Sequence, residues 1–479
     1  MNKYLKYSIL FALFHAIFFV IFLTIFRPIP GVDVAENYFW GVNFEWGYYK
    51  HPPLFAWVQE IFGKVFGISV FTSYFTAQTF IFATFISTFF LAKEFIGFRN
   101  AFFAILLLEA LSFAGITART FNANLVQIPF WVLSSLFYLY GIKEKSLRKS
   151  LLYFALFGFF LGISFLGKYF TLLLAFVIFV SFVSNKETRK LLKTPMPYLA
   201  VFVFFLTILP HLIWFVKSGF SSLQYIAAEQ KRICSFFECR LKYGGSFFVL
   251  SILAILPVIA GFFIYFKNLK FKGFNLQNPE NNFLFCISVL PFSIITIVSL
   301  LNGMFILVKW SATFFFFLPI FLLYFWQFEE RGDLTKRIIV FTTSLFVVWA
   351  LVMFISGKKD KKDKGLHYKI IQNLAETEGE KWEKEFGRTL KIVAGETIDA
   401  GNFAMFSKER PLVMPYNKPE FANYISEKML KEDGYLLLQR CETKDGCNAE
   451  NLGILKESYL TKIKKSSFFL QVIYVKPKL

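Results

Sequence analysis

Long apolar segments constrain the fold of this chain more than any other feature of its sequence. Hydrophobic residues make up 56% of the 479 residues, and 69 residues are Phe. About 20 apolar residues in a helix span the hydrocarbon of a bilayer, and a helix satisfies its own backbone polar groups in lipid. We therefore predict an all-α polytopic membrane domain over residues 1–356, with about eleven transmembrane helices. The windows are roughly 8–26, 74–96, 101–117, 124–142, 151–167, 169–184, 197–216, 246–266, 282–301, 304–326 and 337–356.

The basic residues predict how this domain is oriented. The formal net charge is +20, but Lys and Arg cluster in every second loop, at 143–149, 185–193, 267–272 and 330–337. This is the positive-inside pattern, which places these loops and the N-terminus in the cytoplasm. A distribution over alternate short loops also disfavours a nucleic-acid partner. The loop at about 27–73 and the tail are then expected on the exported side.

The composition changes abruptly after residue 356. Charges become frequent, and the apolar runs at 389–395, 410–415, 434–440 and 468–476 have the length of strands. Amphipathic stretches at 367–386 and 419–433 are typical of helices between them, and 394–406 is typical of a turn leading into a helix. Residues 357–479 are therefore predicted to form a small soluble α/β domain.

The first exported loop is unusually polar for this chain. Asp33 and Glu36 are three residues apart, so on a helical turn they would share a face. Two such carboxylates suit a general base, a divalent-metal cage or a solvated loop. The run LFAWVQEIFGKVFG, which follows His51-Pro52-Pro53, has apolar residues at helical spacing and predicts a helix lying in the membrane interface.

Four of the five cysteines form two close pairs on the side assigned as exported, where disulfides persist. We interpret these pairs as disulfides, with metal binding or chance proximity as the alternatives. The paired cysteines are Cys234 with Cys239, and Cys441 with Cys447.

The motif D-x-x-E-x-Y-x-W, beginning at Asp33, and the following WGYYKHPPLFAW resemble the first outer loop of family 39 glycosyltransferases. These are GT-C membrane enzymes that include protein O-mannosyltransferases and lipid A aminoarabinose transferases. Within this family, the residues of these two motifs are most similar to the lipopolysaccharide galacturonosyl transferase branch. Further similar segments follow in order: FNANLVQIPFW at 121–131, LGKYF at 166–170, PHLIWFVKSGF at 210–220 and VKWSATFFFFLP at 308–319.

The resemblance implies a sugar donor on a polyprenyl phosphate of the undecaprenyl type, and Asp33 as the general base of an inverting transfer. Glu36 would orient Asp33, hold a divalent ion or bind the acceptor. Many family members carry a second acid where Asn122 and Asn124 stand here, which weakens the case for a metal, so a divalent cation is kept only as an option. The leaving phosphate needs cations, and the candidates are Lys50, His51, Arg119, Lys168 and Lys309. Candidates for an anionic acceptor are Lys231, Arg232 and Arg240.

Several of these residues have plain structural alternatives. Lys309 at a helix end suits snorkelling, Arg119 suits an interface marker, and His51 suits a cap on the turn before the prolines. Glu109, inside a predicted helix, matches no motif, and a structural role is favoured for it.

We therefore expect a glycosyltransferase in a bacterial inner membrane, surrounded by membrane lipids, with its active site and C-terminal domain in the periplasm. Its acceptor is expected to be lipid A, core lipopolysaccharide or a related glycolipid. A protein O-glycosyltransferase and a lipid-linked sugar flippase are the competing interpretations. A transporter should place its decisive ionisable groups near the bilayer midplane. Here these groups concentrate at one face, which favours the enzyme.

Overall fold

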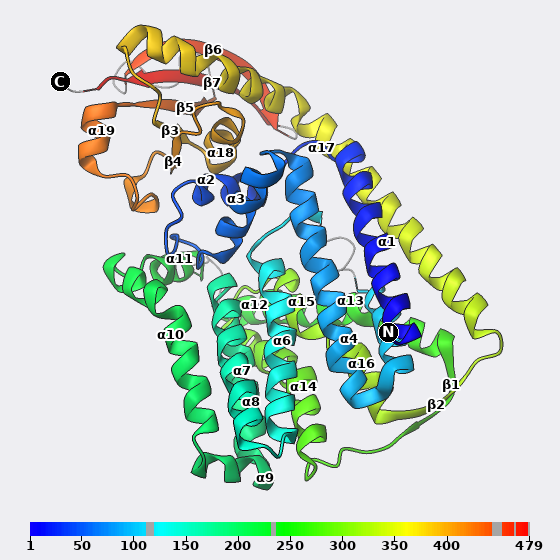
Figure 1. Cartoon of the computed structure of the whole chain (residues 1–479). Helices are drawn as coiled ribbons and strands as arrows, with labels where there is room; N and C mark the ends of the chain where they lie inside the picture. Colours follow the sequence, from blue (N-terminus) through cyan, green and yellow to red (C-terminus); the bar gives the residue numbers. More distant parts are fainter. Residues whose placement is uncertain (112–118, 231–235, 443–452, 464–465, 478–479) are drawn as a thin grey trace.

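The computed structural model describes residues 1–111, 119–230, 236–442, 453–463 and 466–477 (Figure 1). Within these residues, eight helices are long and apolar enough to cross a membrane, or up to ten if two bent helix pairs each count as one span. The eight involve α1 Lys3–Phe26, α4 Val70–Leu108, α6 Ala123–Lys143, α7 Leu147–Gly167, α10 Met196–Lys217, η3 Arg240–Gly245 with α13 Ser246–Tyr265, α14 Pro279–Asn302 and α17 Leu334–Phe386. The bent pairs are α8 Thr171–Ser184 with α9 Lys186–Arg189 and η2 Lys190–Lys193, and η4 Val308–Ser311 and α15 Ala312–Phe315 with α16 Leu318–Phe325.

The multi-pass membrane architecture predicted from the apolar windows is confirmed, and the difference in helix number arises at α4. Two predicted windows, 74–96 and 101–117, fall largely in this one element. Gly97 interrupts it with φ +72°, a backbone conformation that Gly adopts at little steric cost. The described helix ends at Leu108, and this second part is too short to span a bilayer alone.

The two ends of the helical bundle differ in what they carry. The antiparallel strands β1 Phe266–Phe271 and β2 Trp326–Glu330 lie at one end together with α9 (Figure 1). The helices α2 Val32–Gly41 and α3 Leu54–Phe66 lie at the other end, below the C-terminal domain. The basic segments 185–193 and 267–272 are thus separated from the polar first loop, as the charge pattern predicts. Which compartment each end faces stays a prediction.

The first loop contains the helix expected after Pro53 and a further helix, α2, before it. Asp33 lies in the first turn of α2, and Glu36 lies one turn further on. The apolar run after Pro53 forms α3, whose side chains Ile61, Val65 and Phe66 are exposed. An exposed apolar face at this level is consistent with contact to lipid.

The C-terminal domain is an α/β domain with a five-stranded sheet of order β4-β3-β5-β7-β6. Strands β3, β4 and β5 are parallel, and β5, β7 and β6 are antiparallel. The strands are β3 Ile392–Gly395, β4 Leu412–Pro415, β5 Tyr435–Cys441, β6 Ile454–Ile463 and β7 Ser466–Val475. Strand β6 has no counterpart among the predicted strands, because it is a partly polar edge strand without a long apolar run.

The helices of this domain are α18 Thr397–Phe406, η5 Pro419–Phe421, α19 Glu427–Asp433 and the C-terminal part of α17. The turn into a helix predicted at 394–406 is confirmed. The single helix expected at 419–433 is wrong, because Ser426 starts a new helix by accepting a hydrogen bond from the Met429 backbone N–H. Helix α17 runs without interruption from the membrane part into this domain, so the predicted boundary at 356/357 falls inside one helix.

Candidate active site

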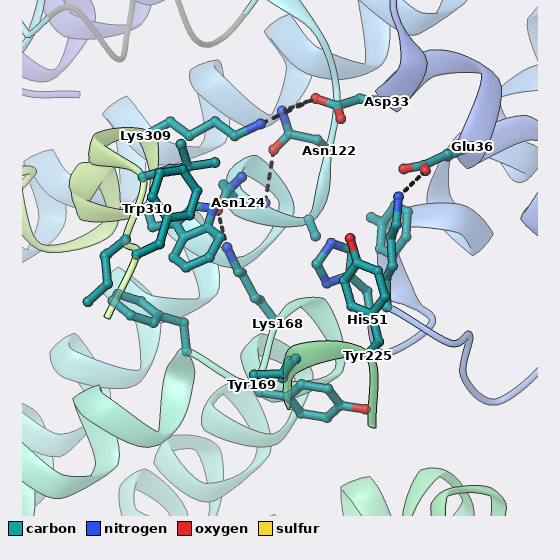
Figure 2. A pocket seen from close by; sticks show the side chains of 18 of the residues that line it. Asp33, Glu36, His51, Asn122, Asn124, Lys168, Tyr169, Tyr225, Lys309 and Trp310 are labelled. Carbon is teal, nitrogen blue, oxygen red and sulfur yellow. Dashed lines mark hydrogen bonds and ion pairs between the residues drawn. The ribbon is translucent and has the colours of Figure 1, made fainter. Parts of the chain in front are cut away.

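A cavity of about 450 Å³ lies where the first loop meets the helical bundle (Figure 2). Its apolar wall includes Phe170, Ile295, Val298, Met304, Phe305, Ile306, Leu307 and Trp310. Its polar side chains are Asp33, Glu36, Asn37, Lys50, His51, Asn122, Asn124, Lys168 and Lys309. Eight of the residues singled out in the sequence therefore converge on one cavity, from segments far apart along the chain.

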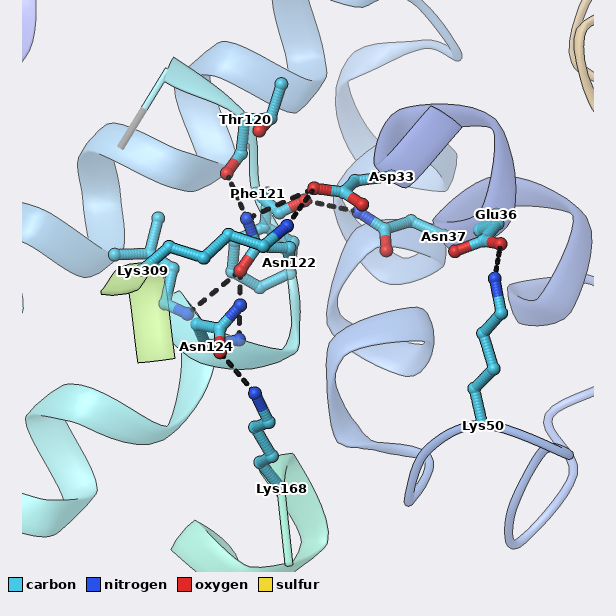
Figure 3. Close-up of polar contacts among 11 residues, drawn as sticks. Asp33, Glu36, Asn37, Lys50, Thr120, Phe121, Asn122, Asn124, Lys168 and Lys309 are labelled. Atoms are coloured by element: carbon cyan, nitrogen blue, oxygen red, sulfur yellow. Dashed lines mark hydrogen bonds and ion pairs between the residues drawn. The ribbon is translucent and has the colours of Figure 1, made fainter. Parts of the chain in front are cut away.

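Asp33 faces this cavity from the start of α2. Its carboxylate lies 3.9 Å from the Lys309 ammonium, and the Asn122 side-chain amide donates to it over 3.5 Å (Figure 3). The side chain keeps 36% of its exposure, so a substrate can reach it. The segment that precedes α6 holds α2 in place, since the Asn37 amide donates to the Phe121 carbonyl oxygen over 2.7 Å.

Lys168 is the most enclosed cation of the cavity, with a residue exposure of 8%. It follows α7 and donates a hydrogen bond to the Asn124 side-chain oxygen, and its ammonium lies 4.4 Å from the Trp310 ring centroid. Burial lowers the pKa of Lys168 well below its usual value, and Lys309 lowers it further, while Asp33 acts in the opposite direction. An anion entering the cavity would relieve this unfavourable environment.

Lys50 and Glu36 form an ion pair on another wall of the cavity. Burial raises the pKa of Glu36, and the Lys50 charge opposes that shift. Burial also acts to lower the pKa of Lys50, but the Glu36 carboxylate outweighs it and the net shift is upward. The Lys50 ammonium lies 5.5 Å from the ring centroids of Tyr49 and Tyr225.

His51 occupies the cavity beside this pair (Figure 2). Burial, followed by the charges of Lys168, Lys50 and Lys309, lowers its pKa well below the usual value. A neutral imidazole can hydrogen-bond to a phosphate but adds no positive charge.

Other candidates lie elsewhere. The Arg119 guanidinium is within 3.4 Å of the Ser356 hydroxyl on α17, and it does not line the cavity. Arg240 donates over 2.8 Å to the Leu301 carbonyl oxygen, also outside the cavity. Glu109 is fully buried against His15, 2.6 Å away. Lys231 and Arg232 lie outside the described residues.

The structure describes only two of the four cysteines that were predicted to form disulfides. Cys239 and Cys441 are disulfide-bonded, whereas Cys286 is free and buried. Cys234 and Cys447, the expected partners, lie outside the described residues, so both pairings stay predictions.

The described part of the chain holds no group of three or more His, Cys, Asp and Glu side chains that could bind a metal ion. Glu36 pairs with Lys50, and Asp33 faces Lys309, so the two carboxylates that share α2 each face a different cation.

Trp310, Asn37 and Tyr225 are among the contributors to the cavity that were not singled out in the sequence. Trp310 lies next to Lys309 in a segment that carries the family resemblance, so its position was a usable signal. Asn37 lies between Glu36 and Tyr38 of the first motif. Tyr225 lies on α11 Ser221–Gln230, in a stretch without a motif, and only the fold brings it to the cavity.

Comparisons with solved structures define the class of this fold. The crystal structure of ArnT from Cupriavidus metallidurans bound to undecaprenyl phosphate superposes with a TM-score of 0.67 at 12% identity, covering 97% of this chain and 98% of that one. The apo structure of the same protein gives 0.68 at 12% identity, covering 98% of each chain. At this identity the likeness establishes the fold, which is the GT-C fold of a multi-pass membrane protein.

The sequence comparison adds a match to a family model over part of the chain. Residues 50–214 match the family model described as dolichyl-phosphate-mannose-protein mannosyltransferase. No curated protein sequence matches the chain. The resemblance to GT-C glycosyltransferases found in the motifs is thus confirmed by a family model over residues 50–214 and by the fold.

Proposed function

We propose that this protein is an inverting glycosyltransferase that moves a sugar from a polyprenyl phosphate to a glycolipid acceptor. The observation that carries the proposal is one cavity in which a reachable carboxylate, Asp33, lies together with the cations Lys168 and Lys309. A base and an anion site in one enclosed space are what such a transfer requires.

In this mechanism the Asp33 carboxylate takes the proton of the acceptor hydroxyl, whose oxygen attacks the anomeric carbon of the donor sugar. The bond between that carbon and the phosphate oxygen breaks, and the oxygen leaves with the electron pair as polyprenyl phosphate. A single displacement inverts the anomeric configuration. A positioned general base contributes roughly 10²–10⁴-fold. Lys168 and Lys309 stabilise the negative charge that grows on the leaving phosphate.

The apolar wall supports a lipid-linked donor. Side chains from Met304 to Leu307, together with Ile295 and Val298, adjoin the polar wall. They offer the first isoprene units an apolar surface next to the cations. The solved ArnT complex contains undecaprenyl phosphate, and we propose a donor of this type.

The acceptor and the location follow from the resemblance and the charge pattern. We propose lipid A, core lipopolysaccharide or a related glycolipid as acceptor, through a hydroxyl or a phosphate group. The reaction would take place at the periplasmic face of a bacterial inner membrane, with the N-terminus in the cytoplasm. The basic segments at the opposite end of the bundle support this orientation.

Two other functions remain as candidates. A protein O-glycosyltransferase is favoured by the description of the matched family model, which names a protein acceptor. A lipid-linked sugar flippase would bind the same donor in the same cavity without transfer. The flippase is disfavoured, because the charged side chains of the cavity gather at the end of the bundle that carries α2.

The test is transfer by the purified protein in lipid nanodiscs. Labelled undecaprenyl phosphate sugars are offered with lipid A, beside a Ser/Thr-rich peptide and a flipping assay. Asp33→Asn should lower transfer at least about 100-fold while undecaprenyl phosphate still binds. Asp363→Asn, which changes an acid of α17 outside the cavity, should leave transfer unchanged. Equal transfer by Asp33→Asn and wild type would refute the mechanism, and flipping without transfer would favour the transporter.

A further inference from the structure

The helix that carries Asp33 is short and depends on its neighbours for its position. Helix α2 has ten residues, a length at which an isolated helix is marginal in water. Its first turn carries Asp33, and the next carries Glu36. Whatever packs against the remaining faces of α2 therefore sets the place of the proposed base.

One face of α2 is covered by α18 of the C-terminal domain. A Cβ atom added to Gly401 would lie 3.0 Å from both the Ala35 Cβ and a ring carbon of Phe39. Met405 of α18 packs in one buried cluster with Val34 and Tyr38. The two helices thus approach so closely that even a methyl group at position 401 would require α2 to give way.

The C-terminal end of α2 is held by Arg410 of the same domain. Its guanidinium donates over 3.0 Å to the Tyr38 carbonyl oxygen and over 2.9 Å to the Glu60 carboxylate of α3. Tyr38 is among the last four residues of α2, whose carbonyl oxygens lack partners inside the helix. Glu60 has a side-chain exposure of 4%, so Arg410 pairs a buried carboxylate and caps a helix end at the same time.

The same domain also contacts the turn that carries Lys50 and His51. The rings of Phe421 and Tyr49 lie 4.8 Å apart, and the Tyr49 ring is in turn 5.5 Å from the Lys50 ammonium. The C-terminal domain therefore contacts both segments of the first loop that contribute polar groups to the cavity. Lys168 and Lys309 come from other elements, the turn after α7 and η4.

We infer that the C-terminal domain is a working part of the proposed active site, and that Arg410 is a positioning residue that fixes α2 and, through it, Asp33. The inference rests on the proposed function. Two roles are therefore separated. The cations that hold the donor phosphate lie on the membrane elements, whereas the base is positioned by a contact from the soluble domain, the clamp formed by Arg410. Loss of the clamp should slow transfer and leave donor binding intact.

The experiment compares Arg410→Ala with Arg388→Ala in the full-length protein. Arg388 also donates to a carbonyl oxygen, that of Glu432 over 2.6 Å, but within the C-terminal domain. For Arg410→Ala we expect kcat to fall about 10- to 100-fold, as for a small misplacement of a catalytic group. Binding of undecaprenyl phosphate, followed by Trp fluorescence, should stay within about twofold of wild type. Arg388→Ala should match wild type in both measurements.

Two further variants separate positioning from loss of folding. Arg410→Lys keeps a cation beside Glu60 but cannot reproduce the fork of the guanidinium, so it should recover part of kcat. Gly401→Val should lower kcat with unchanged donor binding, because it displaces α2 without removing a charge. Wild-type kcat in Arg410→Ala would overturn the inference, as would a parallel loss of kcat, donor binding and thermal stability. Full activity of Asp33→Asn would instead refute the proposed function, whatever Arg410→Ala does.

Discussion

Lys168 combines burial with a neutral hydrogen-bond partner, Asn124, and a nearby cation, Lys309. A buried ammonium without a carboxylate beside it is costly, which is why its pKa is depressed. The Trp310 ring compensates in part through its negative face. The phosphate of undecaprenyl phosphate, the product that leaves in the proposed transfer, is a dianion and would favour the charged ammonium, so its binding should be coupled to uptake of a proton.

This coupling predicts a pH dependence. Since binding favours protonated Lys168, the affinity for undecaprenyl phosphate should be full below the pKa that Lys168 has in the free protein. The affinity should then fall as pH rises through that pKa. Between about pH 7 and about pH 10 the lipid phosphate is already ionised, so its own titration does not cause the change in affinity. Lys168→Arg should bind with little change over this range, because a guanidinium stays protonated. Titrations of Trp fluorescence at several pH values measure both dissociation constants, and a flat wild-type profile would contradict the prediction.

Most residues singled out from the motifs line one cavity, but the motifs did not predict the direction of every side chain. Asp33, Lys168 and Lys309 converge because each lies at the end of a helix on the same side of the bundle. Arg119 precedes α6 by only a few residues, yet its guanidinium turns toward Ser356 on α17. The position of a residue in a motif does not reveal the direction of its side chain, which packing in three dimensions decides.

At the scale of elements, close helix contacts are marked by glycines whose roles differ. In α17, a Cβ on Gly357 would lie 2.1 Å from the Phe26 carbonyl oxygen at the end of α1, whereas one on Gly365 would meet its nearest neighbour only at 3.7 Å. Gly357 therefore permits the close contact between α1 and α17, whereas no close contact requires a glycine at position 365.

These two glycines provide a matched stability test. Ala is favoured over Gly by about 1 kcal/mol in a helix interior, and this term is the same at both positions. Gly365→Ala should therefore be neutral or slightly stabilising, whereas Gly357→Ala should lower the melting temperature, because a backbone oxygen cannot move aside as a side chain can. Thermal unfolding in detergent compares them, and an equal gain at both positions would show that α1 and α17 separate freely.

A second element-scale test concerns the attachment of α18 to the sheet. Asp399 is fully buried, accepts two hydrogen bonds from Arg440 at 2.7 Å and contacts His367 at 2.8 Å. Burial acts to raise the pKa of Asp399, but the bonds from His367 and Arg440 outweigh it and the net shift is downward. Its stabilisation is thus present above the pKa of the unfolded chain and is lost as pH falls through the lower folded value.

Asp399→Asn should destabilise the C-terminal domain by about 3–5 kcal/mol, because it leaves the guanidinium of Arg440 without its carboxylate. Asp433→Asn is the control: that carboxylate pairs with Lys391, whose side chain is 57% exposed, so the cost should stay below about 1 kcal/mol. Thermal unfolding near neutral pH measures both. Similar losses in the two variants would argue against the buried network as the anchor of α18.

The membrane helices were easier to predict than the soluble domain, for a physical reason. A membrane-spanning helix can be recognised in the sequence from its length and apolarity alone. Strand β6 cannot be recognised in this way, because polar residues interrupt its apolar ones, and its antiparallel pairing with β7 appears only in the fold. The docking of α18 onto α2 left no trace in the sequence either, since Arg410 and Tyr38 are 372 residues apart.

For the whole molecule, the separation of basic loops from the cavity predicts accessibility. Lys145 lies in the exposed turn between α6 and α7, and Lys428 lies on exposed α19. Single cysteines at these positions should be labelled by an impermeant maleimide from opposite sides of the membrane in oriented vesicles, Lys145→Cys from the cytoplasmic side. Labelling of both from one side would reject the orientation and, with it, the assignment of the active site to the exported face.

The uninterrupted course of α17 has a consequence for how such chains can diverge. Each residue added or removed in a helix rotates everything beyond it by about 100° and shifts it by 1.5 Å. An insertion between Gly357 and the start of the sheet would swing the domain out of phase with α2, and no side-chain exchange would restore the alignment. Substitutions in this part of α17 that keep its length and its contacts can therefore be tolerated, whereas relatives that share the docking of the domain on α2 should keep the same helix length.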